Sequence, residues 1–215
     1  MYAILDIETT GGQFNEEGIT EIAIYKFDGH EIVDQFISLV NPEIPIQPFV
    51  VKLTGINNAM LRSAPKFFEV AKRIIEITTD CVLVAHNASF DYRILRTEFR
   101  RLGYDFNLKT LCTVELSQKL LPEQPSHSLG KLVRALGIPM ADRHRASGDA
   151  MATVKLFKLL LEKDVDFLKI FRHGQVFSVL TGLTYIGNIK KNSQFGVRKE
   201  LRPELPIGFR FHFKS

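Results

Sequence analysis

Hydrophobic and polar residues follow two different periods along this chain. Near the N-terminus, three apolar segments have the length and composition of strands: Tyr2–Ile7, Ile19–Phe27 and Glu31–Val40. The second and third are joined by Asp28-Gly29, a dipeptide typical of short hairpins. We therefore expect these segments to form the antiparallel part of a sheet.

Further along the chain, apolar residues recur at the spacing of helices. The short apolar run Cys81–Ala85 interrupts this pattern and is typical of a strand inside a sheet. The predicted helices are Pro65–Ile77, Phe90–Leu102, Val114–Leu121, Ser128–Leu136 and Gly148–Leu161, the last with Ser147 as its N-cap. Along the chain, three strands are followed by alternating strands and helices. This order predicts the α/β class, with helices packed on a mixed sheet.

The helical pattern breaks into short pieces with glycines after about Lys163. We therefore predict one domain at residues 1–163 and a basic, aromatic-containing C-terminal extension of unknown role at residues 164–215.

Composition excludes several classes of protein. The chain is 45% hydrophobic and 24% charged, as in soluble globular proteins, and no apolar run approaches the ~20 residues of a membrane span. Asp6 and Glu8 fall where a signal peptide would be apolar. Cys81 and Cys112 are far apart and suit reduced thiols. These features predict a cytoplasmic protein without a membrane partner.

The net charge of +4 hints weakly at a polyanionic partner. From Asn188 onward seven Lys and Arg face two Glu, which gives +5 there and leaves about −1 on residues 1–187. In Phe209–Lys214 aromatic and cationic residues alternate. This segment could be a nucleic-acid platform or an edge strand with a solvated basic face.

Three acidic segments could meet in the fold. In Asp6-Ile7-Glu8, at the end of the first strand, the two carboxylates are two residues apart and so project from one face. Burying two like charges side by side costs heavily unless a cation compensates them. The alternative is a solvated strand end that caps the following turn.

The other two segments each join a loop to a helix. His86–Asp91 (HNASFD) follows the Cys81–Ala85 strand, where open α/β sheets place ligands, and His144–Ala150 (HRASGDA) opens the last helix. Taken singly, Asp91 and Asp149 could simply complement helix dipoles, and the histidines could be ordinary loop residues.

Together the segments indicate metal-dependent phosphodiester chemistry. Carboxylate oxygens without a Cys/His cluster suit Mg²⁺ or Mn²⁺. Two such ions ~3.5–4 Å apart can clamp the attacking and leaving oxygens of an in-line displacement. A histidine, with a pKa of ~6.5, can serve as base for the attacking water.

The motifs DIETTG (Asp6–Gly11), HNASFD and HRASGDA resemble, in order and spacing, those of the DEDDh family of DnaQ-like 3′–5′ exonucleases, which includes the proofreading epsilon subunit of bacterial DNA polymerase III. The resemblance covers about residues 1–163. It implies a ribonuclease-H-like sheet, with His144 as general base. It also implies two divalent cations, Mg²⁺ or Mn²⁺, held by Asp6, Glu8, Asp91 and Asp149.

The same resemblance implies contacts with the terminal nucleotides of a substrate strand. The residues at the corresponding positions are Thr9, Thr10, Leu53, Asn87 and Phe90. One departure is Gly12, where several relatives carry an apolar residue that stacks on a base.

The function we expect is therefore metal-dependent 3′–5′ exonuclease activity. The substrate would be a single-stranded or frayed DNA 3′ end, which would lose 5′-mononucleotides during proofreading or repair. A DNA polymerase is a further candidate partner. The motifs do not separate this reading from an RNA-trimming or short-oligonucleotide exonuclease. The alternative of another class is a non-catalytic nucleic-acid-binding polymerase-accessory module, against which the intact acids and histidine argue.

Overall fold

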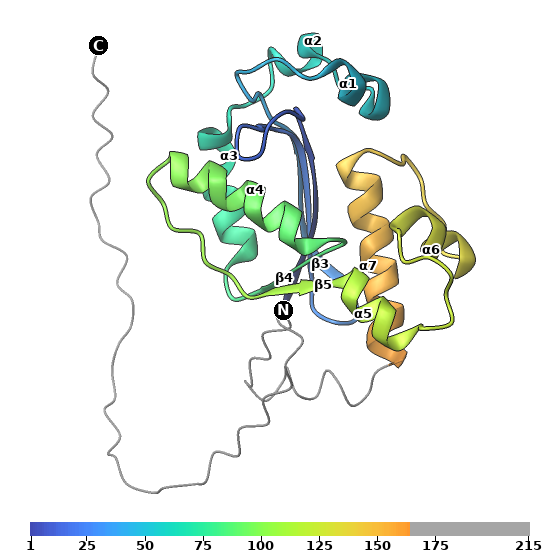
Figure 1. The fold of residues 1–215 in the computed structure, drawn as a ribbon. Coiled ribbons are helices and arrows are strands. Elements are labelled where there is room, and N and C mark those ends of the chain that lie inside the picture. Colours follow the sequence, from blue (N-terminus) through green and yellow to red (C-terminus); the bar gives the residue numbers. More distant parts are fainter. Residues whose placement is uncertain (164–215) are drawn as a thin grey trace, which may run out of the picture. The chain divides into compact units, whose positions relative to one another are not determined.

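In the computed structural model, residues 1–163 are described, and the predictions made for residues 164–215 lie outside them. The described chain forms a five-stranded mixed sheet with helices on both faces (Figure 1), which confirms the predicted fold class. Its strands are β1 (Tyr2–Thr9), β2 (Ile19–Phe27), β3 (Ile32–Leu39), β4 (Val82–Ala85) and β5 (Thr110–Cys112).

The strand order β3-β2-β1-β4-β5 puts β1 at the centre of the sheet. β2 runs antiparallel to both β1 and β3, whereas β4 is parallel to both β1 and β5. Because β1 and β4 run in the same direction, the loop after β1 and the segment after β4 leave the sheet at the same edge. The first two acidic motifs therefore meet there, as expected for a ligand site in an α/β sheet.

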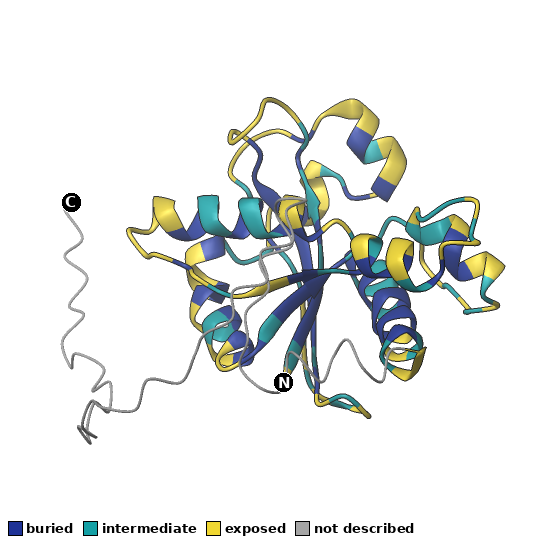
Figure 2. Cartoon of the chain, turned by 60° about the horizontal axis from the view of Figure 1, so that its bottom comes forward, coloured by how far each residue is buried: buried dark blue, intermediate teal, exposed yellow. Residues whose placement is uncertain are grey.

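Helices cover the two faces of the sheet in two groups. The seven helices of the described region are α1 (Pro48–Thr54), α2 (Asn58–Leu61), α3 (Phe67–Thr78), α4 (Ala88–Arg101), α5 (Thr113–Leu120), α6 (Leu129–Ala135) and α7 (Ala146–Lys163). α3 and α4 pack on one face, and α5, α6 and α7 lie on the other (Figure 1). Buried residues line the sheet and the inner sides of these helices (Figure 2).

The alternation of β1 decides which face each acid occupies. Leu5 and Ile7 belong to the core under α3 and α4, whereas Ile4 belongs to the core under α7. Side chains of a strand point to opposite faces in turn, so Asp6 and Glu8 follow Ile4 onto the α7 side. The alternation of β1 thus places the carboxylates of Asp6 and Glu8 on the face of the sheet covered by α7, the helix that begins within the third motif.

The structure differs from the predicted elements at short segments and at one helix start. β5, α1 and α2 were not predicted, because runs of three to seven residues carry too little periodicity. α7 begins at Ala146, so Ser147 lies inside its first turn and is not the N-cap. The distant carboxylate of Glu21 accepts the backbone N–H of Ala146 at 2.9 Å and so satisfies one of the free donors at this helix start.

Two further expectations concern the membrane and the thiols. Within residues 1–163, no helix is long and apolar enough to cross a membrane. Cys81 and Cys112 are free thiols, as predicted.

Candidate active site

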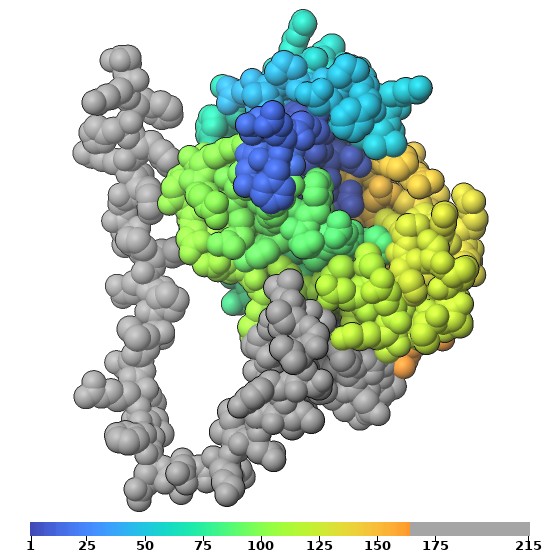
Figure 3. All heavy atoms as spheres, viewed as in Figure 1, coloured from blue at the N-terminus to red at the C-terminus, as the bar shows by residue number. Residues whose placement is uncertain are grey.

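Three of the four predicted acids come together. Carboxylate oxygens of Asp6, Glu8 and Asp149 all lie within 4.8 Å of one another. The first two project from β1, and Asp149 lies in the first turn of α7, which packs across β1 and β2. In Figure 3 the blue atoms of the N-terminal segment are visible where the cyan, green and orange parts of the chain meet.

Asp91, the fourth acid, is tied to the strand that carries the first two. It lies in the first turn of α4 and is buried. Its Oδ1 accepts the backbone N–H of Ile7 at 3.1 Å. The pairing of β1 with β4 ends at Ile4 and Val84, so Asp91 supplies an acceptor beyond the end of the parallel ladder. This bond places Asp91 against the residue between Asp6 and Glu8.

Burial and mutual repulsion make this cluster costly to ionise. Burial, together with the charges of Asp149, Glu21 and Asp91, raises the pKa of Glu8 to about 8. Burial also raises the pKa of Asp91 to about 8. The pKa of Asp6 is raised well above its usual range, first by burial and then by its acidic neighbours. Such a cluster holds its negative charge at neutral pH only when a cation balances it.

Asp149 has an oxygen with nothing to bind it. Its Oδ2 accepts the backbone N–H of His144 at 3.2 Å, whereas its buried Oδ1 has no hydrogen-bond partner. Burial raises the pKa of this carboxyl as well. A buried polar atom without a partner is costly, and a bound cation would satisfy it. The all-carboxylate donor set therefore fits a hard divalent cation such as Mg²⁺ or Mn²⁺.

The two motif histidines are in different situations. His86 is engaged at both ring nitrogens: Nε2 lies 2.9 Å from the carbonyl oxygen of His127, and Nδ1 lies 3.0 Å from Thr113 Oγ1. Burial lowers the pKa of His86 to about 4, so the ring is neutral and structural. His144 is half-buried in the loop before α7, with a left-handed backbone (φ 64°), next to the acids. His144 is thus the better candidate for a base.

The structure adds a pair of residues to which the sequence analysis gave no role. Glu21, on β2, is 3% exposed and lies opposite Glu8 in the strand register. Two like charges at such a position repel. Arg145 compensates this charge with a two-pronged ion pair, in which its Nε and Nη2 donate to Glu21 at 2.9 and 2.6 Å. The pair anchors the loop that carries His144 to the sheet.

Thr9 and Thr10 shape the loop after β1. Thr9 Oγ1 accepts the N–H of Gly11 at 3.3 Å. Thr10 is buried: its N–H donates to the oxygen of Gly18, its own backbone oxygen accepts from Gln47, and its hydroxyl bonds within the loop. The predicted contact of Thr10 with a nucleotide therefore rests on the resemblance alone.

The other three predicted substrate residues are exposed. Leu53 lies on α1 and is 50% exposed, and Phe90 lies at the start of α4 and is 37% exposed. Asn87 is exposed in a left-handed conformation just before α4 (φ 80°). These positions leave the side chains available, and their contact with substrate stays a prediction.

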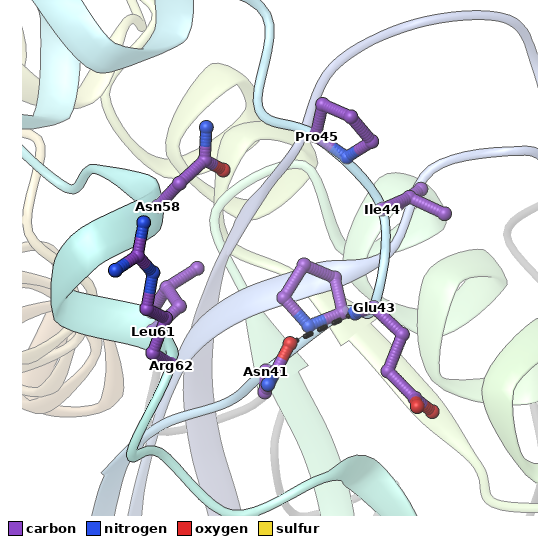
Figure 4. A pocket seen from close by; sticks show the side chains of 8 residues that line it. Asn41, Glu43, Ile44, Pro45, Asn58, Leu61 and Arg62 are labelled. Atoms are coloured by element: carbon purple, nitrogen blue, oxygen red, sulfur yellow. Dashed lines mark hydrogen bonds between the residues drawn. The ribbon is translucent and has the colours of Figure 1, made fainter.

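A separate cavity of about 300 Å³ does not contain any of these residues (Figure 4). It is lined by Asn41, Pro42, Glu43, Ile44, Pro45, Asn58, Leu61 and Arg62. The two asparagine side chains of this cavity bind the protein backbone: Asn41 Oδ1 accepts the N–H of Glu43, and Asn58 Oδ1 accepts the N–H of Ile46. We therefore assign the chemistry to the acidic cluster and not to this cavity.

A sheet edge that collects four acids and a histidine is the arrangement of a metal-dependent nuclease. Residues 3–157 match the family model described as "Exonuclease" (RNase_T), and the chain belongs to this family. This match confirms the predicted exonuclease family, to which the three motifs of the DEDDh pattern had pointed. The roles of the individual residues stay predictions.

Two curated proteins illustrate the sequence relationship. The chain is 38% identical over 162 residues to "DNA polymerase III PolC-type" of Caldanaerobacter subterraneus subsp. tengcongensis, and 36% identical over 163 residues to "3'-5' exonuclease DinG" of Staphylococcus aureus. Each match covers 75% of this chain but only 12% and 18% of those proteins, respectively. The chain thus corresponds to a small part of each relative.

Solved structures show the same fold. Exonuclease X in complex with 5′ overhanging duplex DNA is 30% identical with a TM-score of 0.62, and the match covers 75% of this chain and 92% of that one. Escherichia coli exonuclease I in complex with a dT13 oligonucleotide has a TM-score of 0.68 at 22% identity, over 80% of this chain and 42% of that one. At the lower identity only the fold is comparable.

Proposed function

We propose that this domain hydrolyses DNA from its 3′ end with the help of divalent cations and releases 5′-mononucleotides. The observation that carries the proposal is the meeting of Asp6, Glu8 and Asp149 within 4.8 Å, with one buried oxygen of Asp149 unpaired. The name of the DinG relative and the DNA in the exonuclease X structure support this direction and substrate.

Each residue would have a defined task in this reaction. Asp6, Glu8, Asp91 and Asp149 would hold two cations, Mg²⁺ or Mn²⁺, which when bound would neutralise charge on the phosphate and orient the water. His144 would take the proton of the attacking water. As the water oxygen bonds to phosphorus, the bond from phosphorus to the 3′ oxygen breaks, and that oxygen takes up a proton. Phe90, Leu53 and Asn87 would hold the terminal nucleotides, with Thr9 and Thr10 shaping the loop beside them.

The test compares variants on 5′-labelled single-stranded DNA with Mg²⁺ or Mn²⁺. We expect the wild type to shorten the strand stepwise from its 3′ end, and a 3′-phosphate block to prevent this. His144→Ala should lower kcat by about 100-fold or more, as is typical for loss of a general base. Asp149→Asn should abolish turnover, because it removes a carboxylate from the cluster.

Asp105→Asn is the matched control, since this acid is exposed and lies outside the three motifs. It should degrade DNA at the wild-type rate. Equal, slow degradation by the wild type and Asp149→Asn would show that the proposal is wrong. An RNA strand of the same sequence that is degraded much faster than the DNA would favour the RNA-trimming alternative.

Proofreading, and with it a polymerase partner, is a narrower proposal that rests on the similarity to the PolC-type polymerase. A mismatched 3′ terminus should then be removed faster than a matched one, because it frays more readily. Equal rates on the two termini would contradict a proofreading role.

A further inference from the structure

An aromatic side chain stands exposed in the loop between β1 and β2. Phe14 is 71% exposed, more than any other large hydrophobic side chain in residues 1–163. The guanidinium carbon of Arg93, on α4, lies 4.2 Å from the centre of the Phe14 ring and 5.4 Å from that of Phe90. Arg93 thus contacts both rings, and we refer to Phe14, Arg93 and Phe90 as the aromatic stack.

The stack is held in place from α4. Arg93 forms a two-pronged ion pair with Glu17, at 2.8 and 3.1 Å, and also donates to Asn15 Oδ1 at 3.3 Å. Arg101 donates to the backbone oxygens of Glu17 and Asn15 at 3.3 and 3.0 Å. Two arginines of one helix therefore tie down the loop that presents Phe14. An exposed ring on an anchored loop loses little conformational freedom when it binds a ligand.

The position of the stack connects it to the acidic cluster. Phe90 directly precedes Asp91, whose carboxylate bonds the backbone between Asp6 and Glu8. Arg93 therefore links the Phe14 ring to the beginning of α4, the helix that carries Asp91. The base to consider for Phe14 is therefore one upstream of a 3′ end bound at the cluster.

The charges of the stack indicate which part of DNA it suits. Glu17 is buried and its ion pair occupies Arg93, which lowers the pKa of the Glu17 carboxyl and keeps the pair ionised. Arg93 is thus compensated within the protein and less free to pair with a phosphate. The exposed part is an aromatic surface, which favours stacking against the flat face of a base. Such stacking does not distinguish one base from another.

We propose that Phe14 is a nucleobase-binding residue: a base upstream of the scissile bond stacks on its ring. This inference rests on the proposed function and adds a subsite to it. Arg93 supports the ring from the protein side, and Glu17 fixes Arg93. The contact strengthens binding of a single strand without taking part in the bond-breaking step.

The test measures KM and kcat for a single-stranded oligodeoxynucleotide with Phe14→Ala and Phe14→Tyr. Removing one base stack should raise KM at least about fivefold, the equivalent of about 1 kcal/mol, and leave kcat within about twofold. Phe14→Tyr should retain the wild-type KM, because it keeps the ring. Phe68→Ala, which removes another exposed ring from α3, is the matched control and should not change KM.

A second substrate identifies the partner of the ring. It carries abasic sites at the second to fourth nucleotides from its 3′ end. The wild type should bind it more weakly than normal DNA, and Phe14→Ala should cause no further loss. A wild-type KM for Phe14→Ala on normal DNA would overturn the inference, as would an equal loss on both substrates. These outcomes require an active wild type, whereas an inactive wild type overturns the proposed function itself.

Discussion

Single residues of the acidic cluster are placed by contacts that run across the fold. The acids and His144 could be singled out from the sequence, because three ordered motifs resemble those of an exonuclease family, whereas each segment alone also fitted an ordinary structural role. Two properties could not: the bond from Ile7 to Asp91 and the unpaired oxygen of Asp149. Both depend on where α4 and α7 dock on the sheet, and local sequence does not specify this.

The raised pKa values predict an unusual pH dependence of stability. The folded protein holds protons on Glu8 and Asp91 up to about pH 8, whereas the ordinary pKa values are 4.5 and 3.8. Stability contributed by the protonated groups is thus fully present below about pH 4 and is lost as the pH rises through about 8. In chelator, the Tm of the wild type should fall more steeply over this range than that of Glu8→Gln.

Glu76→Gln, an exposed glutamate of α3, serves as control and should keep the wild-type pH slope. Adding Mn²⁺ should raise the Tm of the wild type more at pH 8 than at pH 5, because ionised carboxylates bind the cation. Parallel melting curves for the wild type and Glu8→Gln across the range would contradict this account of the cluster.

Among the elements, those with clear periodicity could be predicted and those defined by tertiary contacts could not. β2 has the predicted bounds, and the other predicted strands and helices end within a few residues of theirs. β5 has only three residues, and it is defined as a strand by its pairing with β4. Glu21 resembles an ordinary polar position of β2, although a glutamate so close to the apolar run Ile22–Tyr25 is a signal that was available in the sequence.

The ion pair between Glu21 and Arg145 joins β2 to the start of α7, and Arg145→Lys tests its role. Lysine cannot reproduce the two-pronged contact with the buried carboxylate. Because Arg145 is adjacent to His144, we expect kcat to fall about 10-fold, as for other outer residues that orient catalytic groups. KM should change little. The measurement is steady-state degradation of DNA, with the Tm followed in parallel.

Arg134→Lys, an exposed position on α6, provides the comparison and should retain the wild-type kcat. If Arg145→Lys lowers the Tm but leaves kcat unchanged, the ion pair stabilises the fold without positioning the loop of the third motif.

For the whole molecule, charge is divided between two parts of the chain. The net +4 combines about −1 on residues 1–187 with +5 on residues 188–215. We predict that the C-terminal segment strengthens binding to DNA through phosphate contacts. Replacing Lys190, Lys191, Arg198 and Lys199 by Gln should then reduce the slope of log K against log salt by up to about 3, at about 0.7 per contact with single-stranded DNA.

The reaction at saturating DNA should keep its rate in that variant, because none of the four residues belongs to the acidic cluster. Lys155→Gln combined with Lys158→Gln, on α7, controls for loss of positive charge elsewhere. An unchanged salt slope in the fourfold variant would exclude the predicted role of the segment.

The bond between Ile7 and Asp91 also gives the domain an internal reporter. The Ile7 amide hydrogen should exchange with solvent when its bond to the Asp91 carboxylate breaks, since this acceptor is a side chain of α4 and not the backbone of a neighbouring strand. Cations that hold Asp91 in place should slow this exchange, and repulsion among the ionised acids should speed it. Deuterium uptake at one backbone position would therefore follow the state of the site without any substrate present.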